Sequence, residues 1–143
     1  MTTSSALAPR TCTLALDGLP VLAVHGICGL TCGPEVLRCT GATTVEQVLA
    51  LARPDARRHG RITLALRPES AAALVRTRRS EGAGPTAEAV VTVSDSHQRL
   101  RRLRLLNARV SALTNPARSP APSEAGYEHV TILYRNCRSE WAD

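Results

Sequence analysis

Aromatic side chains are almost missing from this sequence. Only 2% of the 143 residues are aromatic, namely Tyr127, Tyr134 and Trp141, and phenylalanine is absent. We therefore expect a core of Leu, Val, Ile and Ala, without the aromatic platforms on which proteins stack single-stranded bases. Lysine is absent as well, so all 18 basic residues are arginine. This uniformity indicates a codon bias more than a separate need for each guanidinium group.

Long hydrophobic runs are also absent, since no segment approaches the roughly 20 apolar residues that span a bilayer. Residues 1–10 lack the basic start and apolar stretch of a cleaved leader. We therefore expect no membrane anchor and assembly in the cytoplasm. We also expect a flexible tail over residues 1–10 and a single domain over residues 11–143, a length that buries a core without a metal or a disulfide.

Catalytic signatures are missing too. The sequence has no Gly-x-Ser-x-Gly elbow, no His-Glu-x-x-His, no dinucleotide fingerprint and no glycine-rich loop followed by Lys-Ser/Thr. The small-residue segment 26–33 is interpreted as a twisted or bulged connection between strands. Carboxylates are scattered, so no acid–base pair is nominated. We expect neither an enzyme nor a cofactor.

Five cysteines form an odd set, which argues against a disulfide framework. Buried free thiols are the main interpretation, and no metal is expected. A structural zinc site is the alternative, because Cys28, Cys32, Cys39 and His25 are suitable ligand types. Their spacing lacks the two tight pairs that zinc sites usually show.

The net charge is +6, and the arginines are clustered. The clusters are Arg57-Arg58, Arg76-x-Arg78-Arg79, and the set Arg99, Arg101, Arg102 and Arg104. The last set alternates with leucines and is interpreted as a solvated or interface-facing strand. No helix-turn-helix, zinc finger or aromatic RNA-binding signature accompanies it, so no specific nucleic acid is expected. A small basic nucleic-acid-binding module, with zinc as an option, is the alternative function.

Hydrophobic periodicity predicts a mainly β protein with one helix, an α+β fold in which a small antiparallel barrel or sandwich is packed by that helix. The helix follows Arg67, with Pro68 and Glu69 in its first turn, arginines in its last turn and Gly82 beyond. Residues 43–53 are ambiguous, because their helical spacing follows a possible cap at Thr44. Turns are expected at Asp17-Gly18 and at 95–97, and a proline-rich loop at 115–126. Strands are expected at 11–17, 20–24, 35–40, 61–67, 86–95, 99–113 (bent or bulged) and 127–134, the last extending toward 141.

The order of these elements carries a resemblance. It rests on the segments 13–21, 24–30, 59–67, 91–95, 105–110 and 129–135 and spans residues 11–141. It resembles the inner-tube proteins of contractile phage tails and related contractile injection systems, the haemolysin-coregulated-protein-like fold. In that family a Gly-x-Ile-Thr-Leu strand precedes the lone helix, as Gly60–Leu64 does here, and Asn-Ala begins a later segment, as Asn107-Ala108 does.

The resemblance implies a structural subunit whose stacked hexameric rings form a channel that sheath contraction propels. It implies further copies, a sheath protein, and baseplate and spike proteins as partners, with lumen cargo as an option. The family usually carries a Trp near Asn-Ala, whereas this chain has Arg109. A main-shaft subunit, a tube-end adaptor and a type VI secreted tube protein therefore stay open. The candidates for inter-subunit or lumen contacts are Arg57, Arg58, Arg99, Arg101, Arg102 and Arg104.

Overall fold

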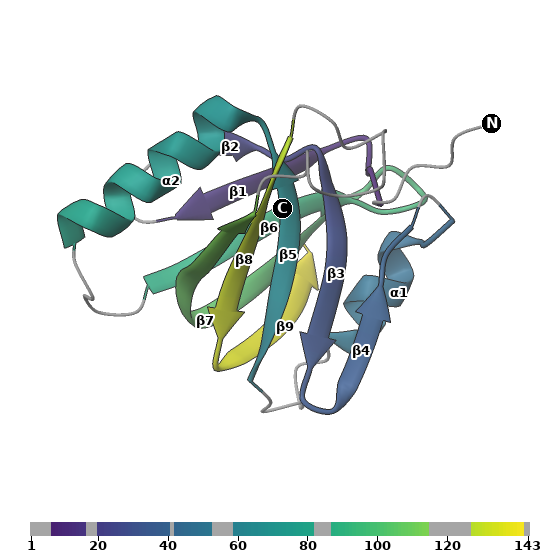
Figure 1. Ribbon diagram of the computed structural model, residues 1–143. Coiled ribbons are helices and arrows are strands. Elements are labelled where there is room, and N and C mark those ends of the chain that lie inside the picture. Colours follow the sequence, from purple (N-terminus) through teal and green to yellow (C-terminus); the bar gives the residue numbers. More distant parts are fainter. Residues whose placement is uncertain are drawn as a thin grey trace.

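A computed structural model of the chain describes residues 7–16, 20–40, 42–52, 59–81, 87–114 and 127–141. Within them the chain forms nine strands and two helices (Figure 1). The strands are β1 (Cys12–Leu16), β2 (Leu22–Ala23), β3 (Gly26–Cys32), β4 (Glu35–Arg38), β5 (Gly60–Leu66), β6 (Ala87–Ser94), β7 (Leu100–Thr114), β8 (Glu128–Tyr134) and β9 (Asn136–Trp141). The helices are α1 (Val45–Leu51) and α2 (Pro68–Glu81).

All strand pairs are antiparallel, and the long strand β7 belongs to two sheets. Its residues 100–108 lie between β6 and β9, whereas residues 109–114 pair with β8. We call β4, β3, β5, β8 and residues 109–114 the front sheet. The back sheet consists of β2, β1, β6, residues 100–108 and β9 (Figure 1).

The sequence-based fold class is confirmed as mostly antiparallel β structure with helices, but the barrel is not closed. The strand order begins at β2 and ends at β4, and these two strands do not pair with each other within the described residues. The expectation of one helix is also wrong, because the ambiguous segment forms α1. Thr44 caps this helix through a capping box with Gln47, and Val45, Val48 and Leu49 are buried.

The interior is aliphatic, as the scarcity of aromatics predicts. Both sheets and both helices contribute to one core cluster, to which α2 adds Ala71 and Leu74. The largest fully buried side chains are Leu14, Ile27, Leu30, Ile62, Leu64, Leu66, Leu74, Leu103, Leu105, Ile132 and Val48. No helix in the described part of the chain is both long and apolar enough to cross a membrane.

The predicted strands are present as far as they lie within the described residues, and so is the turn after Asp95. The last predicted strand does not extend toward 141, because the chain bends at Arg135 and continues as a separate strand, β9, in the back sheet. Two further details differ from the sequence-based expectation. The segment that begins at Gly26 is itself a strand, β3, with a register shift between Ile27 and Gly29, and not a connection between strands. Leu7, within the predicted tail, is 7% exposed and pairs with Ile27, so the folded domain includes that residue. The predicted turn at Asp17-Gly18 and the loop at 115–126 lie outside the described residues.

Candidate functional site

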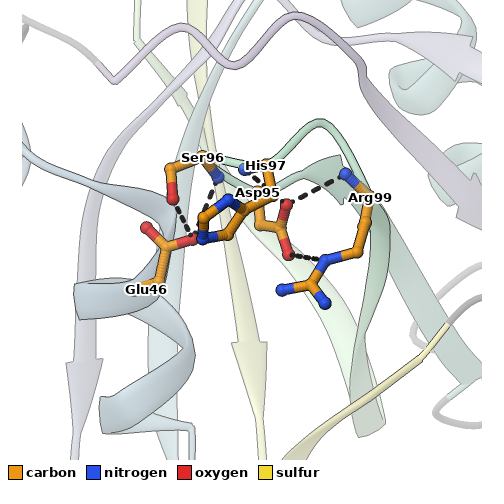
Figure 2. A network of polar contacts seen from close by, with 5 residues as sticks. All are labelled: Glu46, Asp95, Ser96, His97 and Arg99. Carbon is orange, nitrogen blue, oxygen red and sulfur yellow. Dashed lines mark hydrogen bonds and ion pairs between the residues drawn. The ribbon is translucent and has the colours of Figure 1, made fainter.

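The turn between β6 and β7 is held by two carboxylates (Figure 2). Asp95 accepts hydrogen bonds of 2.9 Å from the backbone N–H groups of His97 and Arg99, and its carboxylate lies 3.4 Å from the Arg99 guanidinium. Glu46 of α1 accepts bonds of 2.9 Å from the backbone N–H and the hydroxyl of Ser96. These bonds tie α1 to the turn from which β7 starts.

The same contacts shift the acidity of both carboxyl groups. The backbone N–H of Ser96 is the main cause that lowers the pKa of Glu46. Burial by itself raises the pKa of Asp95, but the hydrogen bonds from Arg99 and His97 together outweigh it, and the net shift is downward. Both side chains are therefore carboxylates at neutral pH and act as fixed acceptors for the turn.

Trp141 stands at this end of the back sheet and is 50% exposed. It pairs in register with Arg101, whose guanidinium carbon lies 4.0 Å from the centroid of the Trp141 ring. The guanidinium carbon of Arg99 lies 4.6 Å from the same centroid. The two arginines thus pack on one indole by cation–π contact. Within the described residues, the buried Nε of Arg101 has no hydrogen-bond partner.

Arg104 is held by two acids of the neighbouring strands. Its guanidinium donates to Glu88 of β6 and to Glu140 of β9. These bonds raise the pKa of Arg104, and the bond from Arg104 lowers the pKa of Glu140. Arg104 therefore ties together the three strands β6, β7 and β9 on the outside of the back sheet.

The six predicted contact arginines do not share one face. Arg57 and Arg58 lie outside the described residues. Side chains alternate along a strand, so Arg99 and Arg101 lie on the Trp141 side of β7, whereas Arg102 and Arg104 point to its other side. The dense arginine set is therefore divided between two sides of the strand. Consecutive residues such as Arg101 and Arg102 necessarily point in opposite directions.

The front sheet carries a second basic group that sequence reasoning did not select. Arg61 of β5 and Arg109 of β7 both pair in register with Leu133 of β8. The basic residues of this group are Arg61, Arg109, His59 before β5 and Arg135 after β8, and all four are exposed. A cleft of about 570 Å³ lies beside these basic residues. It is lined by His59, Gly60, Asn107, Arg109, Leu133, Tyr134 and Arg135. The group is invisible as a sequence cluster because three separate segments supply it.

The proposed zinc ligands are not gathered. Cys28 and Cys32 stand about 13 Å apart along an extended strand of this length. Cys32 instead faces Cys137, with 3.8 Å between the Sγ atoms, and the His25 ring stacks on Tyr127 at a centroid distance of 3.9 Å. No group of three His, Cys, Asp or Glu side chains in the described part of the chain is placed to hold a metal. The zinc alternative finds no site there.

No protein-family model matches the sequence, and no curated protein matches it significantly. Solved structures do share its fold. A chain of the anti-feeding prophage cap, the AFP tube terminating cap, aligns at 12% identity and a TM-score of 0.56 over 94% of this chain and 91% of that chain. A chain from the anti-feeding prophage baseplate aligns at 12% identity and 0.54 over 99% and 98%.

A third chain comes from the sheath–tube complex of an extracellular contractile injection system, PVC, in the extended state. It aligns at 7% identity and a TM-score of 0.50 over 94% of this chain and 92% of that chain. At such identities the likeness shows a common fold, which extends over nearly the full length of every chain compared.

Proposed function

We propose that this chain is a structural subunit of a contractile injection system or phage tail, in the inner tube or at its end. The observation that carries the proposal is the fold shared with chains of the tube cap, the baseplate and the sheath–tube complex of such particles. The subunit forms hexameric rings that stack into a channel, and sheath contraction drives that channel forward. Its work is mechanical, without catalysis or a cofactor.

The open ends of the strand order support assembly. Strand β4 has four residues and ends the order on one side, and its Val36 is 74% exposed. Strand β2 has two residues and ends the order on the other side, next to Val21, which is 64% exposed. Unpaired strand edges pair readily with other chains. Head-to-tail contacts that close by rotation make rings, and stacked rings make filaments.

The predicted contact arginines keep this role within the proposal. Arg102 is the best placed of those described, because it is half-buried on the outside of the back sheet and no ion pair to it is observed in the described part of the chain. Arg57 and Arg58 complete the proposed contact set. Further copies, a sheath protein, and baseplate and spike proteins are the proposed partners, with cargo in the lumen as an option, and assembly begins in the cytoplasm.

Negative-stain electron microscopy, with light scattering over a concentration series, tests the proposal. We expect rings or stacked tubes with a central hole and a mass that rises with concentration. Substitution of the exposed edge residue by Val36→Lys is expected to shift the protein toward monomer, because a charged edge resists strand pairing. The control Ala50→Lys adds the same charge at an exposed position on α1 and should assemble like the unmodified chain.

A strictly monomeric particle at every concentration would contradict the ring. Rings that form equally well with Val36→Lys would contradict pairing through β4 while leaving the ring in place. The two results therefore distinguish failure of ring formation from failure of the proposal that β4 mediates it.

A further inference from the structure

The outside of the front sheet is a basic face with an apolar centre. Arg61, Leu133 and Arg109 form one row across β5, β8 and β7, because the register pairs both arginines with the leucine. Arg135 follows at the junction of β8 and β9, where its backbone N–H donates to the carbonyl of Leu106 at 3.0 Å. His59 precedes β5. All four basic residues are exposed, whereas Leu133 is half-buried.

This basic face includes the cleft of about 570 Å³, whose lining contains two arginines and a histidine but no Asp or Glu. Within the described residues, no ion pair to Arg61, Arg109 or Arg135 is observed. Guanidinium groups offer several donors in a fixed fork that matches a carboxylate or phosphate. The face is therefore built to receive negative charge that the described part of the chain does not supply.

A second copy of the chain is a poor occupant. Within the described residues, Glu46 is bound to Ser96, Asp95 to Arg99, and Glu88 and Glu140 to Arg104. Three further acids whose exposure is described lie on three different elements, namely Glu35, Glu69 and Glu128. With a net charge of +6, this chain would meet its own basic face with repulsion.

The lining favours a protein over a nucleic acid. Single-stranded nucleic acids rely on exposed aromatic side chains for stacking, and the one aromatic residue at the cleft, Tyr134, is 2% exposed. Its hydroxyl donates to the carbonyl of Thr31 at 2.7 Å and is already engaged. Leu133 lies between two arginines, so the face instead matches a peptide segment in which acidic residues flank an apolar residue.

The spacing also fits such a segment. Strands in a sheet lie about 4.8 Å apart, so Arg61 and Arg109 are separated by roughly 10 Å across β8. An extended peptide covers that distance in about three residues. Because alternate side chains of an extended peptide point to one side, a Glu-x-Leu-x-Glu segment presents both carboxylates and the leucine to this face, and its carboxylates, about 13 Å apart along the backbone, lie within reach of the two long arginine side chains.

We infer that the basic face of the front sheet binds an acidic segment of a partner protein. Its carboxylates meet Arg61, Arg109 and Arg135, and an apolar side chain meets Leu133. This inference stands on the charge and register of the face and does not require that the chain form rings.

Fluorescence anisotropy with the full chain tests this inference. The probe is a fluorescein-labelled peptide of Glu-Ser-Leu-Ser repeats ending in Glu, which presents its glutamates and leucines on one side, and an oligothymidylate of equal charge is measured beside it. The double variant Arg61→Gln/Arg109→Gln should weaken peptide binding at least about tenfold, because each hydrogen bond to a charged group contributes about 1.5 kcal/mol or more. The matched variant Arg67→Gln/Arg138→Gln removes the same charge from two exposed positions outside this face and should weaken peptide binding less than about twofold, through the change in net charge alone.

Equal losses in the two double variants would overturn the site, because binding would then follow net charge alone. Tighter binding of the oligothymidylate than of the peptide would overturn the class of partner in favour of nucleic acid. Peptide binding that is lost only in the front-sheet variant supports the inference even if microscopy shows no rings. Failure of one proposal is thus distinguishable from failure of the other.

Discussion

The two sheets place arginine on their outer surfaces in opposite ways. On the back sheet, Arg104 lies between Glu88 and Glu140 and is bound to both. On the front sheet, Arg109 is exposed beside Leu133 and the basic residues of the cleft. Both arginines belong to β7, five positions apart, so the strand itself does not decide their roles. The cross-strand neighbours do.

This difference separates two uses of one residue type. An arginine with acidic neighbours on both adjacent strands stabilises the sheet locally. An arginine beside apolar and basic neighbours makes no such pair within the described residues, and an external anion would relieve the repulsion between the positive charges. Arg104 is therefore structural, whereas Arg109 is available for binding.

The largest effect is expected from Gly60→Ala, which tests whether the front-sheet cleft has a rigid floor. A Cβ at this position would collide with the carbonyl oxygen of Thr31 and lie 2.7 Å from the hydroxyl of Tyr134. Strand β3 cannot move away without breaking its pairing with β5. We expect a loss of about 3 kcal/mol in the free energy of unfolding, measured by urea denaturation.

Gly29→Ala is the matched control for that substitution. Its Cβ would lie 3.3 Å from the carbonyl oxygen of Leu37, on the edge strand β4, which can yield. We expect a change of less than about 1 kcal/mol. If the two alanine variants unfold at the same urea concentration, the backbone around Gly60 can adjust as easily as the edge strand β4 does. The prediction that the floor of the cleft is rigid would then be wrong.

A smaller effect is expected from Arg104→Gln, which tests the comparison of the two sheets directly. The variant leaves Glu88 and Glu140 near each other without their shared cation, so its urea midpoint at neutral pH should fall below that of the unmodified chain. Arg109→Gln removes the same charge from the front sheet and should leave the midpoint unchanged or raise it slightly. Equal destabilisation by both variants would mean that the sheets do not differ in this way.

The effect of Arg104→Gln should depend on pH. Arg104 lowers the pKa of Glu140 in the folded chain, from an ordinary value of 4.5. A lowered pKa contributes stability that is complete above the unfolded value and disappears as pH falls through the folded value. The difference between the two urea midpoints should therefore be largest near neutral pH and shrink as the pH falls below the ordinary value of about 4.5. A difference that stays constant to low pH would exclude this ion pair as its origin.

Much of the fold follows from local signals in the sequence. Alternation of Ile62, Leu64 and Leu66 predicts β5, and the cap residue Thr44 with helical spacing behind it is compatible with α1. Pro68 and Glu69 place the start of α2 correctly. These signals work because a strand or a helix end is fixed by residues that are close in the sequence.

The basic face of the front sheet follows from no local signal. Arg61, Arg109 and Leu133 come from three segments, and only the register of β5, β7 and β8 brings them into one row. Conversely, the dense arginine set that begins at Arg99 is divided by the period of the strand between two sides of the sheet. In a β-sheet, residues that are adjacent in sequence point to opposite faces, and the neighbours of a side chain on its own face come mostly from other strands. A run of arginines in the sequence therefore does not predict a group of arginines on one face.

The least perturbing test concerns the interior, where the two sheets meet. Cys32 of the front sheet and Cys137 of the back sheet are both fully buried, and burial raises the pKa of Cys137 to about 12. Burial likewise raises the pKa of Cys12 to about 12 and that of Cys39 to about 11. Cys28 is half-buried.

Since the thiolate is the reactive form, an aromatic disulfide reagent near pH 8 should label Cys28 first and the other four cysteines only as the chain unfolds. Thiol release followed by absorbance measures this, and Cys28→Ser should remove the fast phase. Fast labelling of Cys32 or Cys137 in the folded chain would show that the back and front sheets separate readily at β9. The difference between their outer surfaces would then rest on two sheets that move independently of each other.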